Sequence, residues 1–287
     1  MRKYFLIFAA CSMLLCCQSG KEKQSDPDVP EEPVEVPYEI PCSCGDEWLQ
    51  EETTCDNDRE LPWDYPVKPG MEEWEKLSNR REAIEACQIP EDVLSSLTTE
   101  DLLQICLQYP LIFDVLSPSF YDRGLDFVFE QFNGIRELFK REDALNELLE
   151  QYRCRIQKLP FIEDSDASDL EKGYFVLTIE SLELILSRYH ASDDSKEDYK
   201  EILQHLFCGY EIQIMCPIMG TIGFPMRNPN FFSRARLIVK IDEQNLERIP
   251  QKDMNGIFSQ FNWIDEPTMR AIDELSCEIL QLNPKKP

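Results

Sequence analysis

The chain has 287 residues and a formal net charge of −26, with 55 Asp and Glu against 29 Lys and Arg. Such acidity argues against nucleic acid as a partner and against electrostatic attachment to anionic lipid, because both need cationic side chains to meet phosphates. Hydrophobic residues make up 43% of the chain, which argues against disorder and is enough to bury a substantial core.

The first element of the chain is an export signal. A basic pair precedes the apolar run 4–15, which is typical of a secretory signal peptide and too short to span a membrane. The run is followed by two cysteines and then polar residues, an ending that resembles a bacterial lipobox. Cys17 is the better lipid acceptor, because Cys16 then supplies the small residue before the cut. We therefore expect removal of residues 1–16 and lipidation of Cys17; the alternative is an ordinary secretory signal with two incidental cysteines.

Residues 17–41 are expected to form a tether. Prolines recur every three or four residues and alternate with Asp and Glu, a pattern that predicts extended polyproline II in place of helix or sheet. At ~3.1 Å per residue such a segment holds the rest of the chain several nanometres from a membrane. Residues 42–70 are expected to be irregular, because turn-forming residues are dense there and prolines interrupt any pattern.

The cysteines after Cys17 are odd in number, so an exported protein should pair some and leave at least one free or paired with another molecule. We expect a disulfide between Cys87 and Cys106, which two antiparallel helices can bring together; the alternative is two buried thiols that act as small apolar residues. Cys42 and Cys44 give a weak zinc pattern with Cys55, since a fourth ligand and the usual spacing are missing. No metal or cofactor is expected.

Helical periodicity dominates residues 71–287 and predicts an all-α domain, either an irregular multi-helix bundle or a helical stack. The segment from Ser168 to Tyr189 begins with capping-box spacing and is apolar on two faces. We expect it to be the central helix, with partners on both sides. Further helices are expected at 196–208, 230–246 and 267–282, and a short hairpin or a buried connection at 210–226.

The segment from Gly209 to Asn230 is the predicted contact element. It is long for a connection between helices, and long ordered loops often bind or close over ligands. Cys208 and Cys216 flank its first turns and are placed to staple it. The alternative is a buried segment that closes one end of the helices. Its adaptable side chains, which suit a contact surface, are Met215, Met219, Phe224 and Met226.

No catalytic residue can be named from the sequence. His190 and His205 lack metal-compatible partners at helical spacing, and no nucleophile elbow, P-loop or dinucleotide fingerprint occurs. A pair of carboxylates for glycoside hydrolysis cannot be singled out among so many. The aromatic residues of the proline-rich entry predict either a carbohydrate platform or a set of rings that fastens this segment to the first helix. They are Trp48, Trp63, Tyr65 and Trp74.

Four stretches carry a family resemblance: residues 65–74, 86–94, 106–111, and 132–135 leading to 141–144. Together they resemble a family of uncharacterised exported proteins from gut Bacteroidetes, many of them lipoprotein-like. The resemblance covers about residues 64–152 in detail and the remainder loosely, and the cysteine-rich insert 42–55 departs from it. It implies a helical domain and a cell-envelope setting, and it assigns no activity or catalytic residues.

The sequence thus predicts a helical body on a lipidated tether, anchored to a bacterial membrane, the outer membrane being favoured. Its expected role is binding or interaction, with a protein or glycan partner besides the membrane that holds the lipid. The alternatives are a carbohydrate- or cell-wall-active enzyme that uses paired carboxylates, and a glycan-binding lipoprotein that works beside an importer.

Overall fold

The structure is a computed structural model that describes residues 40–44, 60–112, 130–189, 195–221, 229–250 and 264–284. Within these ranges the regular elements are helices, and the one isolated β-bridge joins Cys42 and Pro284. The predicted all-α class is confirmed. The predicted signal segment, Cys17 and nearly all of the predicted tether lie outside the described residues.

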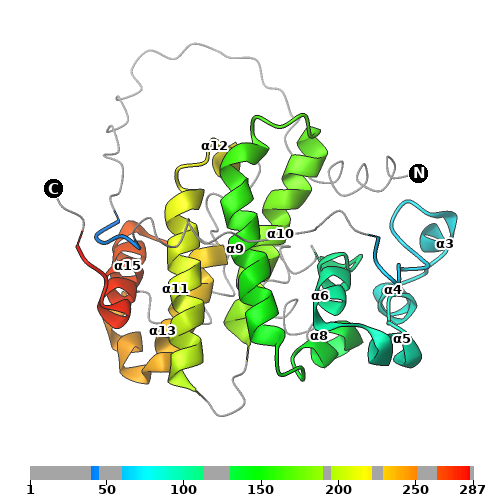
Figure 1. Cartoon of the computed structure of the whole chain (residues 1–287), viewed down its shortest axis with the longest axis horizontal. Helices are drawn as coiled ribbons and strands as arrows, with labels where there is room; N and C mark the ends of the chain where they lie inside the picture. Colours follow the sequence, from blue (N-terminus) through cyan, green and yellow to red (C-terminus); the bar gives the residue numbers. More distant parts are fainter. Residues whose placement is uncertain are drawn as a thin grey trace.

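Short helices build one side of the molecule, drawn in cyan to green-cyan in Figure 1. Two of them, α4 and α6, begin with a side-chain cap: the side chains of Asn79 and Thr98 accept hydrogen bonds from the backbone N–H groups of Glu82 and Asp101. The helices are α3 (Glu72–Glu75), α4 (Arg80–Ala86), α5 (Glu91–Ser96), α6 (Thr99–Leu107) and α8 (Asn133–Leu138).

Long helices build the rest of the molecule, with α9, α10, α11 and α13 packed against one another and α15 against α11 and α13 (Figure 1). A short helix, α12, and a 3₁₀ turn, η3, lie between them. The bounds are α9 (Ala144–Ile162), α10 (Asp169–Arg188), α11 (Lys196–Gln213), α12 (Pro217–Thr221), α13 (Pro229–Ile241), η3 (Glu243–Arg248) and α15 (Glu266–Leu280).

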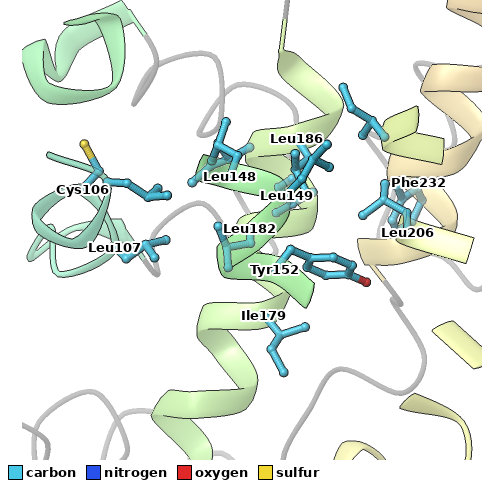
Figure 2. Close-up of a cluster of buried hydrophobic side chains, with 14 of the residues drawn as sticks. Cys106, Leu107, Leu148, Leu149, Tyr152, Ile179, Leu182, Leu186, Leu206 and Phe232 are labelled. Carbon is cyan, nitrogen blue, oxygen red and sulfur yellow. The ribbon is translucent and has the colours of Figure 1, made fainter. Parts of the chain in front are cut away.

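Helix α10 is the central helix, as predicted. It contacts α9, α11 and α13 and also reaches α6 in the layer of short helices. Its start carries the capping box, in which Ser168 and Glu171 bond each other's backbone N–H groups. Figure 2 shows Ile179, Leu182 and Leu186 of α10 inside the apolar cluster that joins the two parts of the molecule.

Helix α11 is longer than predicted and leaves no room for a hairpin. It continues to Gln213 because Tyr210, Ile212 and Gln213 are all buried against neighbouring helices. Residues 217–221 then form α12, so the described part of 210–226 is helical apart from a short turn. Helix α13 ends earlier than expected, at Ile241, where Asp242 caps the following 3₁₀ turn.

Two disulfides fasten residues 40–44, called the strap from here on, to the long helices. Cys42 pairs with Cys277 of α15, and Cys44 pairs with Cys208 of α11. The backbone N–H of Cys44 also donates to Oε2 of Glu211 at 2.8 Å. These pairs account for Cys42 and Cys44 without zinc. Cys154 is disulfide-bonded too.

The predicted Cys87–Cys106 disulfide is wrong: both are free, buried thiols. Each thiol lies in the apolar core near the ring of Tyr65, where it fills space as a small hydrophobic side chain. Burial raises the pKa of Cys87 to about 12 and raises that of Cys106 as well. The predicted staple is also wrong, because Cys208 is taken by the strap and Cys216 is a free, buried thiol.

The stretches that carry the family resemblance meet in the layer of short helices. Asn133 bonds both backbone groups of Ile89, accepting from its N–H at 3.0 Å and donating to its carbonyl at 2.7 Å. A Cβ on Gly134 would lie 2.5 Å from the ring of Phe132 and 2.9 Å from Ile89. These residues therefore hold α8 against the α4–α5 connection, which is a structural role.

Candidate functional site

Exposed apolar side chains gather at one end of the long helices. Among the described residues four large hydrophobic side chains are exposed, and three of them occupy the carboxyl-terminal ends of α9 and α11. Phe161 is 75% exposed, Ile214 50% and Met215 70%; the fourth, Met71, lies beside α3. Figure 1 shows the ends of α9 and α11 beside α12 at the top of the molecule. We call Phe161, Ile214 and Met215 the apolar end.

Local sequence explains why these side chains face outward. Pro160 lies in the last turn of α9, which ends at Ile162; Ile162 packs inward, while Phe161 is exposed. In α11 the buried Gln213 is followed by a tight turn in which the N–H of Cys216 donates to the carbonyl of Gln213. This turn places the side chain of Cys216 in the interior and leaves Ile214 and Met215 exposed.

The two helix ends are close enough to affect each other electrostatically. Burial raises the pKa of the Cys216 thiol, and the carboxylate of Glu163, just after α9, raises it further because a nearby negative charge opposes thiolate formation. Glu163, Asp164 and Asp166 are exposed in the connection from α9 to α10. The apolar end therefore has acidic residues beside it.

The predicted contact residues are divided by the structure. Met215 is exposed in the apolar end, whereas Met219 is partly buried and packs against the core from α12. Phe224 and Met226 lie outside the described residues. The sequence did not point to Phe161 or Ile214. The available signal was an aromatic residue two positions before the acidic segment 163–169 and an isoleucine just past the last buried turn of α11.

A buried polar network lies beneath the apolar end. Its centre is Glu183 of α10, fully buried, whose Oε1 accepts from Tyr152 Oη at 2.9 Å, Asn230 Nδ2 at 2.8 Å and Gln213 Nε2 at 2.5 Å. These donors come from α9, α13 and α11, so one carboxylate joins four helices. Removal from water raises the pKa of Glu183, and the three donors with the Arg234 charge partly oppose that shift.

Arg234 of α13 extends the buried polar network to α15. Its Nε donates to Asn230 Oδ1 at 2.7 Å, and its Nη1 forms an ion pair with Asp273 Oδ1 at 2.5 Å; Arg234 and Asp273 are both 0% exposed. The guanidinium also lies over the rings of Phe231 and Tyr210, 4.6 and 4.8 Å from their centroids.

The buried polar network positions the apolar end and is itself closed to solvent. Gln213 is the last residue of α11, so its bond to Glu183 fixes the helix end from which Met215 projects. Hydrogen bonds between side chains of different helices specify which helix faces meet. The network went unnoticed in the sequence, although Glu183 stands between buried leucines in a helix that is apolar nearly all round. A glutamate at such an apolar position indicates a buried polar group that needs hydrogen-bond partners on other helices.

The other sites suggested by the sequence are structural where the structure describes them. Tyr65 is buried, donates its hydroxyl hydrogen to the carbonyl of Ile105 and has Trp63 edge-on at 4.7 Å. These rings fasten the entry segment and do not form a platform. Nδ1 of His205 lies 3.0 Å from the carbonyl oxygen of Glu201, and burial lowers the pKa of the imidazole. Trp48 and His190 lie outside the described residues.

One surface hollow has several carboxylates in its lining, as an enzyme that uses paired carboxylates would require. It measures about 440 Å³ and lies between the first turns of α11 and the end of α15, with Glu197, Asp198 and Glu201 in its lining. Glu197 and Glu201 are exposed, and Glu197 pairs with Lys200. A catalytic acid needs burial or a close carboxylate partner to hold its proton near neutral pH, and this open surface supplies no burial.

Within the described ranges no group of His, Cys, Asp and Glu is arranged to hold a metal ion, and no helix is long and apolar enough to cross a membrane. Comparisons with protein families, with curated proteins and with solved structures found no match to this chain.

Proposed function

We propose that the protein is a lipid-anchored cell-envelope module that binds a partner protein through its apolar end. The observation that carries this proposal is the grouping of Phe161, Ile214 and Met215, exposed at one end, while other large hydrophobic side chains of the long helices are buried or half-buried. Grouped apolar side chains on a surface are typical of interaction sites, whereas single ones are ordinary.

The chemistry of these side chains favours a protein partner over a glycan. Sugars bind to flat aromatic faces with hydrogen-bonding groups at their rims, and Phe161 is the sole aromatic residue of the apolar end. Met215 and Ile214 are flexible aliphatic side chains that adapt to an apolar protein surface.

The envelope setting is supported by the signal, by Cys17 and by the disulfides. Disulfides persist in oxidising compartments outside the cytoplasm, and the strap uses two of them. An acidic polyproline tether would give the module reach while its lipid holds it on the membrane.

Photocrosslinking tests the contact surface. A photoreactive amino acid is placed at Met215, at Phe161 or, as the control, at Met71, which is 40% exposed beside α3. We expect one discrete protein adduct in cell envelopes from the first two positions and none from Met71. The adduct from Met215 should disappear when Phe161→Ser is added, with the melting temperature unchanged. Equal labelling at all three positions, or labelling of lipid alone, would refute the proposal.

A further inference from the structure

The apolar end combines two properties that together restrict its partner. The first is adaptable apolar area: Met215 has three rotatable bonds and a polarisable sulfur, and Phe161 and Ile214 add bulk. The second is negative charge, which the connection from α9 to α10 supplies next to those side chains. A partner has to satisfy both properties to bind tightly.

The negative charge of this connection is not neutralised within it. Glu163, Asp164 and Asp166 are exposed. Lys172 follows in α10, and its ammonium donates to the backbone carbonyl of Glu163. That bond places one cation at the start of a segment with several anions, so the rim of the apolar end stays acidic. Lys158 is exposed on the last turns of α9 and adds one further cation.

Charge excludes two partners that an apolar surface would otherwise suit. A second copy of the chain carries the same net charge of −26, so pairing two apolar ends brings two acidic rims together. An anionic bilayer surface repels the same rim. A basic protein segment is attracted instead, because its Lys and Arg can face the acidic rim while its apolar residues cover Phe161 and Met215.

Resting on the proposed function, we infer that the apolar end binds a cationic amphipathic helix of a partner protein. Apolar residues at i+4 and i+7 of such a helix lie about 6 and 10 Å along the axis from residue i on the same face, and they serve as anchors. The acidic rim steers the basic face and raises the association rate at low salt.

Synthetic peptides test the chemistry of the partner. The probe is a helical peptide of about 18 residues with leucine on one face and lysine on the other; the matched control keeps the leucines and carries glutamate in place of lysine. Binding is followed by titration calorimetry at two salt concentrations. We expect the lysine probe to bind, to weaken as salt rises, and to bind at least about tenfold more tightly than the glutamate control.

Variants separate binding at the apolar end from general attraction to an acidic protein. Phe161→Ser combined with Met215→Ser should weaken the lysine probe at least about tenfold, since each loses a buried apolar contact. Met71→Ser should leave it unchanged. Asp164→Asn combined with Asp166→Asn should reduce both the affinity and its salt dependence. These side chains are exposed, so circular dichroism is expected to match the parent.

Two results would overturn the inference: equal binding of the glutamate control, or unchanged binding of the lysine probe by the Phe161→Ser, Met215→Ser variant. The second would mean that bulk charge alone attracts the peptide. If photocrosslinks from Met215 persist in either case, the apolar end is a contact surface for a partner of different chemistry. If they are absent as well, the proposed function fails too.

Discussion

Gly209 permits the close packing of α9 against α11. A Cβ at this position would lie 2.2 Å from Tyr152 Oη and 2.7 Å from its ring. The missing side chain lets the Tyr152 hydroxyl reach Glu183. A glycine within a helix costs about 1 kcal/mol relative to alanine, and here that cost is offset by access to the buried polar network.

Gly209→Ala should lower the free energy of unfolding by about 1–3 kcal/mol, because the added methyl displaces Tyr152 from Glu183. Chemical denaturation measures the change. The same substitution in a Tyr152→Leu background should cost much less, because the ring that it strikes is gone. An equal cost in both backgrounds would mean that the methyl acts on something other than Tyr152.

Glu183 gives the fold a pH dependence with a defined sign. Burial raises its pKa in the folded state, so the folded protein binds this proton more tightly than the unfolded chain. Its contribution to stability is therefore complete below the ordinary glutamate pKa and is lost as pH rises through the folded pKa. Relative to Glu183→Gln, the parent should lose stability as pH rises from about 4 toward neutral.

Glu171 is the matched control with the opposite sign. Hydrogen bonds from the side chain and backbone of Ser168 lower its pKa, so its contribution is present above the ordinary glutamate pKa and is lost as pH falls. Denaturation curves of the parent, Glu183→Gln and Glu171→Gln across this pH range give both slopes. Parallel slopes for the two variants would contradict the assignment of a raised pKa to Glu183.

At the scale of elements, the sequence predicted the helices that are defined by local patterns. The capping box at Ser168 and the two apolar faces of α10 depend on residues within one helix, and both predictions are confirmed. The end of α11 was missed because Gly209, a residue type common just after a helix end, directly follows the predicted helix 196–208. What continues the helix is a bond to Glu183, 30 residues away in sequence, which no local pattern reveals.

The candidate site was predictable in part for the same reason. Met215 was a candidate because of the composition of its segment, and its side chain is 70% exposed. Phe161 belongs to the same surface because α9 and α11 end beside each other, which depends on tertiary packing. Disulfide partners are still harder to predict from the sequence. Cys42 and Cys277 are 235 residues apart, and the spacing of the cysteines does not indicate that the fold brings these two together.

The strap should contribute strongly to stability. Replacing Cys42 and Cys277 together by serine should lower the free energy of unfolding by about 4–5 kcal/mol in the loop-entropy model, because with Cys44–Cys208 intact this disulfide closes a loop of about 70 residues. Cys216→Ala, which changes a thiol that is free in the fold, is the control and should cost much less. Unfolding curves that do not differ between these variants would show that the strap contributes little.

Thiol mapping checks the cysteine assignment independently. Under denaturing but non-reducing conditions, alkylation should label Cys87, Cys106 and Cys216, whereas Cys42 and Cys44 should appear in disulfide-linked peptides with Cys277 and Cys208. A linked peptide containing Cys87 and Cys106 would restore the pairing that the sequence suggested and would contradict the fold around Tyr65.

At the scale of the whole molecule, the strap sets where a tether would join the body. It is bonded to α11 at Cys208, and Met215 lies seven residues further along the chain, about 10 Å at 1.5 Å per residue. A lipidated tether that ends at the strap would therefore join the body close to the apolar end. Partners in the same membrane would meet this surface at a raised effective concentration, limited by the length of the tether.

That arrangement depends on lipid at Cys17, which fractionation tests. Cys17→Ser removes the thiol that we propose as the lipid acceptor, so the protein should move from the membrane pellet to the soluble fraction of the envelope. Metabolic labelling with a palmitate analogue should mark the parent and leave the variant unmarked. Cys11→Ser, a change within the apolar run of the predicted signal, should alter neither result. If the Cys17→Ser protein is folded and still pellets with the membrane, the anchor is not a lipid on this cysteine, and an effective concentration set by the tether no longer applies.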